Sequence, residues 1–218
     1  QATKNIKIGS SSTIISTSDP VRVYEDFATI DLISNGRAEI IAGRASRVGL
    51  YELLGYDLRN YEELFEEKFD LLNQINKEER VTWNGEFRAS LSDAEVLPRP
   101  LEGKMPIWRA VGGSPASAIK AGIAGVPMFL AHLAGPTEAF KRSIDAYRSA
   151  LTQSGYNPDE FPIATAGLFY AAETTQEAQR AYYPCVNEGI KLTNGSGFSK
   201  RAFAQGEDVR DVLNVGSP

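Results

Sequence analysis

The residues that are best suited to bind a ligand lie within 105–126, where an apolar strand runs into Gly-Gly-Ser-Pro and then into an Ala-rich helix. Gly112 and Gly113 would let the backbone turn tightly and approach a ligand. Ser114 would cap the helix, and Pro115 suits the first helical position, where its missing N–H has no cost. Amides at a helix start, with the helix dipole behind them, favour a phosphate group. The turn therefore predicts an anion site, although many strand-to-helix connections look similar and bind nothing.

The composition limits the class of protein and of partner. The chain has 218 residues, 42% of them hydrophobic and 23% charged, which is typical of one folded domain or most of a larger one. Its formal net charge of −5 argues against nucleic acid or an anionic membrane as partner. No apolar run approaches the roughly 18 residues that span a bilayer. We therefore expect a cytoplasmic protein with a small-molecule substrate.

Other residues that could do chemistry have weaker support. Cys185 is the only cysteine, which argues against an internal disulfide, and no Cys/His group has zinc-site spacing, so we expect no metal. His132 could transfer a proton, but without a visible partner a structural role is the simpler interpretation. The carboxylate pairs at 62–63 and 66–67 fall on a helix whose acidic face is most simply solvated, which disfavours paired-carboxylate catalysis.

Strand-like and helix-like segments alternate along the chain, as they do in βα units with a mainly parallel sheet. The predicted strands are Ile6–Thr17, Arg37–Gly43, Ile107–Val111, Pro127–Leu133 and Phe161–Ala172. The predicted helices follow them at 21–34, 60–76, 115–124, 137–154 and 175–192. The second of these helices is the clearest, and its buried stripe at helical spacing is formed by Leu64, Phe65, Phe69 and Leu72.

Two segments look like additions to this scaffold. Val81–Ser90 predicts a short hairpin that turns at Asn84-Gly85. The Gly-, Ser- and charge-rich stretch at 193–211 predicts a mobile loop, the kind of segment that often covers a site. We expect residues 1–218 to form a single, partial domain.

Five consecutive βα units fit two architectures. A doubly wound sheet would be complete with five strands, whereas a (β/α)8 barrel would lack three strands and typically needs about 250 residues. The chain begins at Gln1 and stops after a second Gly-Ser-Pro at 216–218, so both ends fall where an element should continue. We therefore expect a segment of a barrel.

Four collinear segments closely resemble the bacterial luciferase-like monooxygenases, a family that uses FMN or the deazaflavin F420. They are SSSTIISTSDPVRVYEDFATIDLISNGRAEIIAGRAS at 10–46, LLGYDLRNYEELFEEKFDLL at 53–72, PIWRAVGGSPASAIKAG at 106–122 and VGSP at 215–218. The resemblance covers nearly the whole chain. It implies an α/β fold, a TIM (β/α)8 barrel of which about strands 3 to 7 are present.

The resemblance also implies where the cofactor binds. The flavin phosphate sits where the fifth strand of the barrel meets its helix, which here falls on Gly112, Gly113, Ser114 and Ser117. Strand ends on the same face of the barrel should border the flavin ring, and they carry Ser16, Thr17, Gly43, Arg44, Ala45 and Ser46. The Arg44 guanidinium suits an oxyanion, and a salt bridge that docks a helix is an equally weighted alternative. No proton-transfer residue is assigned.

The function implied by the resemblance is FMN-dependent monooxygenation. Reduced FMN, supplied by a flavin reductase, would react with dioxygen and oxidise a small organic substrate in a site shielded from water. One alternative is hydride transfer with F420 as the cofactor. Another is a flavin-binding barrel protein without catalytic activity. We also expect a homo-oligomer.

Overall fold

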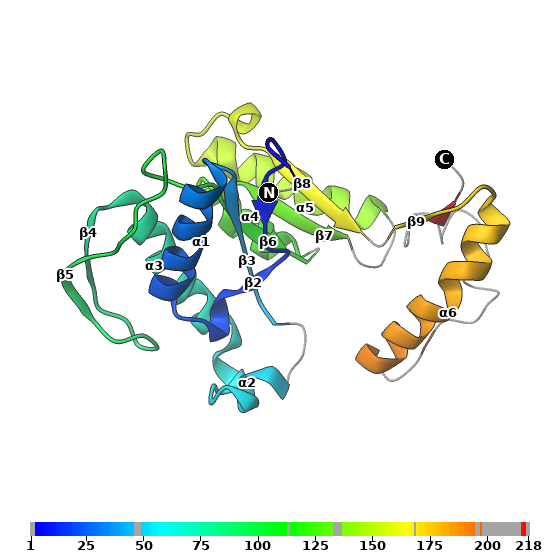
Figure 1. Cartoon of the computed structure of the whole chain (residues 1–218), viewed down its shortest axis with the longest axis horizontal. Coiled ribbons are helices and arrows are strands. Elements are labelled where there is room, and N and C mark those ends of the chain that lie inside the picture. The colour runs from blue at the N-terminus through cyan, green and yellow to red at the C-terminus, as the bar shows by residue number, and fades with distance from the viewer. Residues whose placement is uncertain are drawn as a thin grey trace. The chain divides into compact units, whose positions relative to one another are not determined.

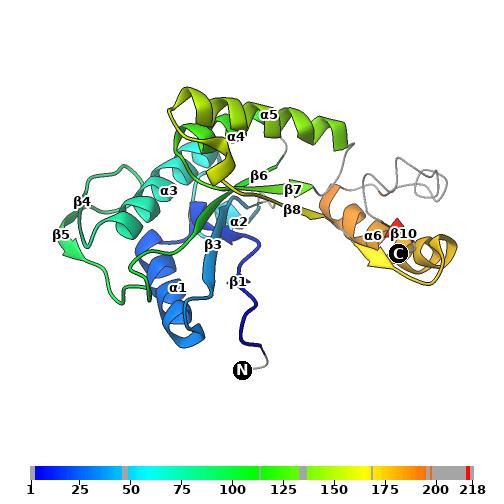
Figure 2. The same cartoon turned by 90° about the horizontal axis from the view of Figure 1, so that it is seen from above.

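The computed structural model of the chain describes residues 3–45, 49–112, 114–132, 137–167, 169–194, 197 and 215–216. Ser46, Gly113 and nearly all of the loop predicted at 193–211 lie outside these residues. The chain divides into two compact units, residues 1–110 and residues 111–218. Figure 1 and Figure 2 show the elements of each unit.

The first unit has parallel main strands separated by helices. Its elements are β1 (Ile8–Gly9), β2 (Thr13–Ile14), the 3-10 turn η1 (Ile15–Thr17), α1 (Pro20–Ser34), β3 (Ala38–Gly43), α2 (Gly49–Leu53), the 3-10 turn η2 (Leu58–Asn60), α3 (Tyr61–Lys77), β4 (Arg80–Trp83), β5 (Leu91–Glu95) and β6 (Ile107–Val111), which ends at the boundary. Both β1 and β2 pair in parallel with β3, and β3 pairs in parallel with β6, with Ile40 opposite Ile107. The strand predicted at Ile6–Thr17 is thus two short strands followed by a 3-10 turn.

The boundaries of α1 follow from local sequence. The Asp19 carboxylate accepts hydrogen bonds from the backbone amides of Val21 (2.9 Å) and Arg22 (3.4 Å), as an N-cap does. The helix ends where Asn35 adopts a left-handed conformation, with φ of 63°. The helix predicted at 21–34 is therefore confirmed.

The buried stripe predicted for α3 is also confirmed. Leu64, Phe65, Phe69 and Leu72 are all buried, and α3 packs against α1 (Figures 1 and 2). Burial of such a stripe is the main source of stability for an amphipathic helix in a protein.

The hairpin differs from its prediction. β4 pairs with β5 in antiparallel register, and residues 84–90 form a long connection where a tight turn at Asn84-Gly85 was predicted. The Glu67 carboxylate accepts hydrogen bonds from the backbone amides of residues 86, 87 and 88, so a tertiary contact shapes this connection. Figures 1 and 2 show the hairpin on the side of α3 that is remote from β3.

The second unit continues the alternation of strand and helix. Its elements are α4 (Pro115–Ile123), β7 (Met128–His132), α5 (Thr137–Gln153), the 3-10 turn η3 (Pro158–Glu160), β8 (Ile163–Gly167), β9 (Tyr170–Ala171), α6 (Thr175–Asn194) and β10 (Val215–Gly216). β7 pairs in parallel with β8 from Met128 opposite Ile163 to His132 opposite Gly167. The strand predicted at Phe161–Ala172 is divided into β8 and β9. None of the described helices is both long enough and apolar enough to cross a bilayer.

α4 and α5 pack closely because Gly122 has no side chain. A Cβ at Gly122 would lie 2.7 Å from both the Ala150 Cβ and the Tyr147 carbonyl oxygen. The Tyr147 side chain is fully buried, and its hydroxyl donates a hydrogen bond of 2.8 Å to the Val126 carbonyl. Burial raises the pKa of Tyr147 from 10.0 to about 12.

This shift predicts alkaline destabilisation. Because the Tyr147 pKa is higher in the folded state, its contribution is complete below pH 10 and is lost as the pH rises towards about 12. We expect the free energy of unfolding to fall by up to about 2 kcal/mol over this window from this group. Urea denaturation at several pH values, compared with Tyr147→Phe, measures the contribution. An equally steep alkaline loss in the variant would contradict it.

Candidate functional site

The start of α4 is the place where the sequence predicts an anion site. Ser114 occupies the N-cap position with φ of −78° and ψ of 119°, and Pro115 follows at the first helical position. The Ala118 amide donates to the Ser114 carbonyl at 3.3 Å, while the amides before it belong to the first turn, which has no intrahelical acceptors. The Ser114 side chain forms no capping hydrogen bond with the described residues, contrary to the prediction. Its hydroxyl therefore has no capping role.

Two further observations fit a phosphate group at this helix start. The Ser117 hydroxyl oxygen is buried and has no hydrogen-bond partner in the described part of the chain, which is costly without a ligand. A Cβ at Gly112 would meet no described atom within 4 Å, so no described residue fills the space beside this backbone. An anion with several acceptor oxygens would satisfy both the amides and the hydroxyl. The residues present thus fit the phosphate of a cofactor.

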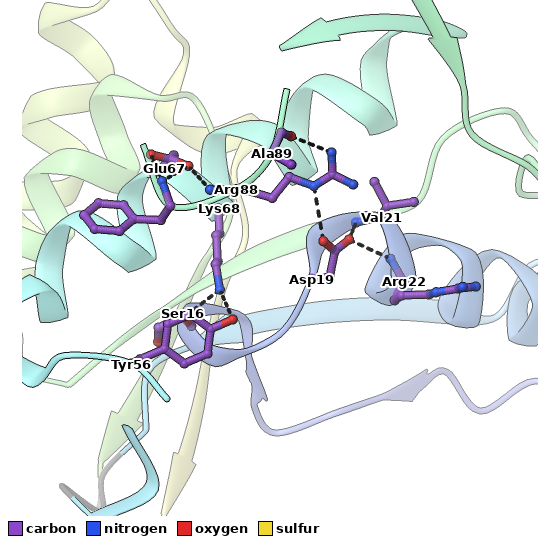
Figure 3. Close-up of polar contacts among 10 residues, drawn as sticks. Ser16, Asp19, Val21, Arg22, Tyr56, Glu67, Lys68, Arg88 and Ala89 are labelled. Atoms are coloured by element: carbon purple, nitrogen blue, oxygen red, sulfur yellow. Dashed lines mark hydrogen bonds and ion pairs between the residues drawn. The ribbon is translucent and has the colours of Figure 1, made fainter. Parts of the chain in front are cut away.

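In the first unit, polar contacts hold η1 beside the carboxyl end of β3. Ser16 is fully buried, and its hydroxyl accepts a hydrogen bond of 3.1 Å from the Tyr51 hydroxyl. The Ser16 carbonyl accepts a bond of 2.8 Å from the Lys68 ammonium, which also donates to the Tyr56 hydroxyl at 3.0 Å (Figure 3). Thr17 is half-buried at the end of this turn.

Gly43 and Ala45 lie where side-chain volume is limited. A Cβ at Gly43 would lie 2.8 Å from the Ser12 Cβ and 3.3 Å from the Ala110 Cβ, so only glycine lets these strand ends approach. Ala45 is buried in an apolar cluster with Tyr51 and Leu64. Both residues have packing roles in this unit, and contact with a flavin stays a prediction for each.

Arg44 is bound to α3. Its guanidinium forms salt bridges with Glu62 (2.8 Å) and Glu66 (3.3 Å) and lies over the Phe65 ring, 3.7 Å from the ring centroid. These contacts are the helix-docking salt bridge that the sequence offers as the alternative for this residue. Its contact with an oxyanion stays a prediction.

A buried arginine, Arg109, was missed by the sequence reasoning. The Arg109 side chain, on β6, is 2% exposed, and its guanidinium binds both Glu66 carboxylate oxygens, at 2.7 and 2.8 Å. Glu66 therefore serves two guanidinium groups, those of Arg44 and Arg109. The expectation of a solvated acidic face is wrong for Glu66 and for Glu67, because tertiary contacts engage both carboxylates.

Lys68 was also missed, although the sequence contains a signal for it. Residue 68 lies four positions after Leu64 and four before Leu72, within the apolar stripe of α3. A lysine at such a position must bury its ammonium group, which requires hydrogen-bond partners. The partners themselves are not predictable from local sequence, because Ser16 is 52 residues away.

The remaining candidates gain no new role. The backbone of His132 ends β7, and its side chain lies outside the described parts. Cys185 is exposed on α6.

Comparisons with known proteins agree with this fold. The family profile described as luciferase-like monooxygenase matches residues 1–213. The monooxygenase RslO1 from Streptomyces bottropensis is similar, with a TM-score of 0.85 and 25% identity over 99% of this chain and 65% of that chain. An FMN complex from Pseudomonas putida, the oxygenating constituent of 3,6-diketocamphane monooxygenase, has a TM-score of 0.72 and 20% identity over 99% of this chain and 67% of that chain.

A curated relative uses the other cofactor of interest. The F420-dependent glucose-6-phosphate dehydrogenase of Amycolatopsis mediterranei strain U-32 is 30% identical over 129 residues, which are 57% of this chain and 38% of that protein. The chain spans about half the length of the curated relatives it matches. The structural matches confirm the α/β fold of a partial TIM (β/α)8 barrel.

Proposed function

This chain belongs to the luciferase-like monooxygenase family, and we propose that it binds FMN and uses the reduced cofactor with dioxygen to oxidise a small organic substrate. The family contains flavin-dependent and F420-dependent members. The observation that carries the proposal is the buried Ser117 hydroxyl, which has no partner among the described residues and lies in the first turn of α4. A phosphate-bearing cofactor provides the missing acceptor.

In this proposal the chain binds and orients, while the bound cofactor supplies the redox chemistry. The first-turn amides of α4 and the hydroxyls of Ser114 and Ser117 donate hydrogen bonds to the phosphate oxygens. Gly112, where an added Cβ would meet no described atom within 4 Å, would allow close approach to the backbone. The family resemblance assigns the ring-bordering role to the strand ends at 16–17 and 43–46. Packed residues there would exclude water from the reacting atoms.

Replacing Ser117 by Ala tests the phosphate contact. We expect FMN affinity to fall about tenfold, which corresponds to one lost hydrogen bond to a charged group. Riboflavin has no phosphate, so its affinity is expected to stay unchanged. The stability of the cofactor-free protein should be equal or slightly higher, because the variant removes a buried hydroxyl that no described residue satisfies.

Flavin fluorescence titration and thermal unfolding measure these effects. Ser149→Ala, on the neighbouring α5, is a matched control whose exposed hydroxyl should be irrelevant to both ligands. Equal losses for FMN and riboflavin would place the phosphate elsewhere. A wild-type protein that binds neither FMN nor F420 would overturn the proposed function.

A second candidate function is F420-dependent hydride transfer. The 30%-identical relative from Amycolatopsis favours it, because its name specifies F420. Both cofactors carry a phosphate, so the Ser117 contact serves either. The absorbance spectrum of the protein after incubation with an equimolar mixture separates them, since flavin and deazaflavin absorb at different wavelengths. Retention of F420 without FMN would replace the first candidate by the second.

The proposal extends to partners. A family member that consumes reduced FMN requires a flavin reductase to supply it, and we infer such a reductase together with a small-molecule substrate. We also infer a homo-oligomer. Size-exclusion chromatography with light scattering measures the oligomeric state directly.

A further inference from the structure

The Lys68 ammonium is buried in an unusual way. The residue is 2% exposed, and the two acceptors that the described residues offer its ammonium are uncharged oxygens, the Ser16 carbonyl and the Tyr56 hydroxyl. The ammonium also lies 4.2 Å from the centroid of the Tyr56 ring. Burying a charge is costly, and an apolar side chain of similar length would pack in this stripe without that cost. The presence of a lysine at this position is therefore better explained by the segment that its ammonium binds than by packing within the stripe.

The segment that Lys68 holds is η1. Ser16 is bound from two sides, since the Tyr51 hydroxyl of α2 donates to its side chain and Lys68 of α3 donates to its carbonyl. A 3-10 turn has few internal hydrogen bonds of its own, so external donors determine its orientation. The half-buried Thr17 comes next and takes its direction from Ser16.

A second set of contacts from α3 holds Asp19, which lies two residues after η1. Glu67, the residue before Lys68, binds the amides of 86, 87 and 88. From this connection the Arg88 guanidinium donates to the Asp19 carboxylate at 3.2 Å, and Asp19 caps α1 (Figure 3). Adjacent residues of α3 thus hold Ser16 directly and Asp19 through Arg88, on either side of Thr17 and Ser18.

We propose that Lys68 is a positioning residue for the flavin ring, which acts by fixing the turn Ser16–Thr17 at the carboxyl end of the strands through its bond to the Ser16 carbonyl. The inference rests on the proposed function, because the ring-bordering role of Ser16 and Thr17 comes from the family resemblance. It adds that the site depends on a buried cation that touches neither the ring nor the phosphate.

Lys68→Met tests the proposal, because Met fills the stripe with an unbranched side chain and donates no hydrogen bond. The first readout needs no flavin. Hydrogen exchange of the amides at 15–18 should become about tenfold faster in the variant, while exchange in β3 stays unchanged, because the loss of one charge-assisted bond loosens this turn alone. Lys77→Met, on the exposed end of the same helix, is the matched control and should change neither segment.

The second readout is flavin binding. We expect FMN and riboflavin to lose affinity by the same factor, about tenfold, because the ring is common to both. The absorption spectrum of bound FMN at saturation should also shift relative to wild type, an effect that a loss of stability alone would not produce. Tyr51→Phe removes the other bond to Ser16 with less risk to folding, and it should change both readouts in the same direction.

The outcomes separate the two hypotheses. Unchanged exchange at 15–18 in both variants would overturn the positioning role. Faster exchange with unaltered flavin affinity and spectrum would also overturn it, and Lys68 would then serve the fold alone. Failure of the wild-type protein to bind any flavin would refute the proposed function before a variant is compared, and the ring-positioning role would fail with it.

Discussion

Glu66→Gln will lower the free energy of unfolding by about 3 kcal/mol, the range measured when one partner of a buried ion pair is removed. The Glu66 carboxylate binds Arg109 through two hydrogen bonds and Arg44 through a third. The Arg109 side chain is 2% exposed, so its charge has no access to water when the carboxylate is lost. Both guanidinium groups also pack against the Phe65 ring, which does not replace the lost charge.

Urea denaturation followed by circular dichroism measures this effect. Glu63→Gln is the matched control, because Glu63 lies in the same turns of α3 and is exposed. It should change stability by less than about 0.5 kcal/mol. The double variant Glu66→Leu with Arg109→Met should recover much of the loss, since an apolar pair of similar volume can replace a buried ion pair. A single variant as stable as the control would show that the pair contributes little.

Asp31→Ala will lower the free energy of unfolding by a similar amount, through contacts that include the amino end of β3. The Asp31 side chain is buried, and its two oxygens accept hydrogen bonds from the backbone amides of Ala38 and Leu101, each at 3.0 Å. Removing the carboxylate leaves two amide donors without their partner, at roughly 1–3 kcal/mol for each buried group. The expected loss in the free energy of unfolding is about 3 kcal/mol. Because Ala38 begins β3, the loss destabilises the entry to a central strand.

A graded series makes this prediction sharper. Asp31→Asn keeps one acceptor oxygen and should lose about half as much stability as Asp31→Ala. Asp26→Ala, on the exposed face of the same helix, should be nearly neutral. Equal losses for the Asn and Ala variants would assign the effect to the charge of Asp31 and not to the two hydrogen bonds.

Variants at Asp31 and at Glu66 should differ in their effect on flavin binding. Asp31, on α1, binds the amide of Ala38 at the start of β3, the end of a barrel strand that serves stability. Glu66 holds Arg44, which follows the carboxyl end of β3. We therefore expect Asp31 variants to retain flavin affinity wherever they remain folded, whereas Glu66 variants also change the position of Arg44.

Local sequence determined much of the secondary structure. The helix predicted at 21–34 is α1, which Asp19 caps, and the spacing of Leu64 and Phe69 predicted the buried face of α3. These predictions succeed because capping and amphipathic spacing act over one or two turns of chain. The anion-site prediction at the start of α4 has the same local origin. The structure adds to it the buried, unpartnered Ser117 hydroxyl.

Two errors arose from contacts between distant residues. The hairpin connection at 84–90 is shaped by hydrogen bonds to the Glu67 carboxylate, and turn propensities do not include such a contact. The acidic face of α3 was expected to be solvated. Glu66 is instead bound by Arg44, which follows β3 and is 22 residues away, and by Arg109, which lies on β6 and is 43 residues away.

The sequence by itself determined the family and the order of βα units, and it predicts where the phosphate-binding turn lies. Each depends on the identity and spacing of neighbouring residues along the chain. Only the tertiary structure decided that Lys68 holds Ser16, that Glu66 binds two arginines and that Arg44 docks a helix. A buried charge takes its partner from whatever the packed elements bring within hydrogen-bond distance, and that proximity exists only in the folded chain.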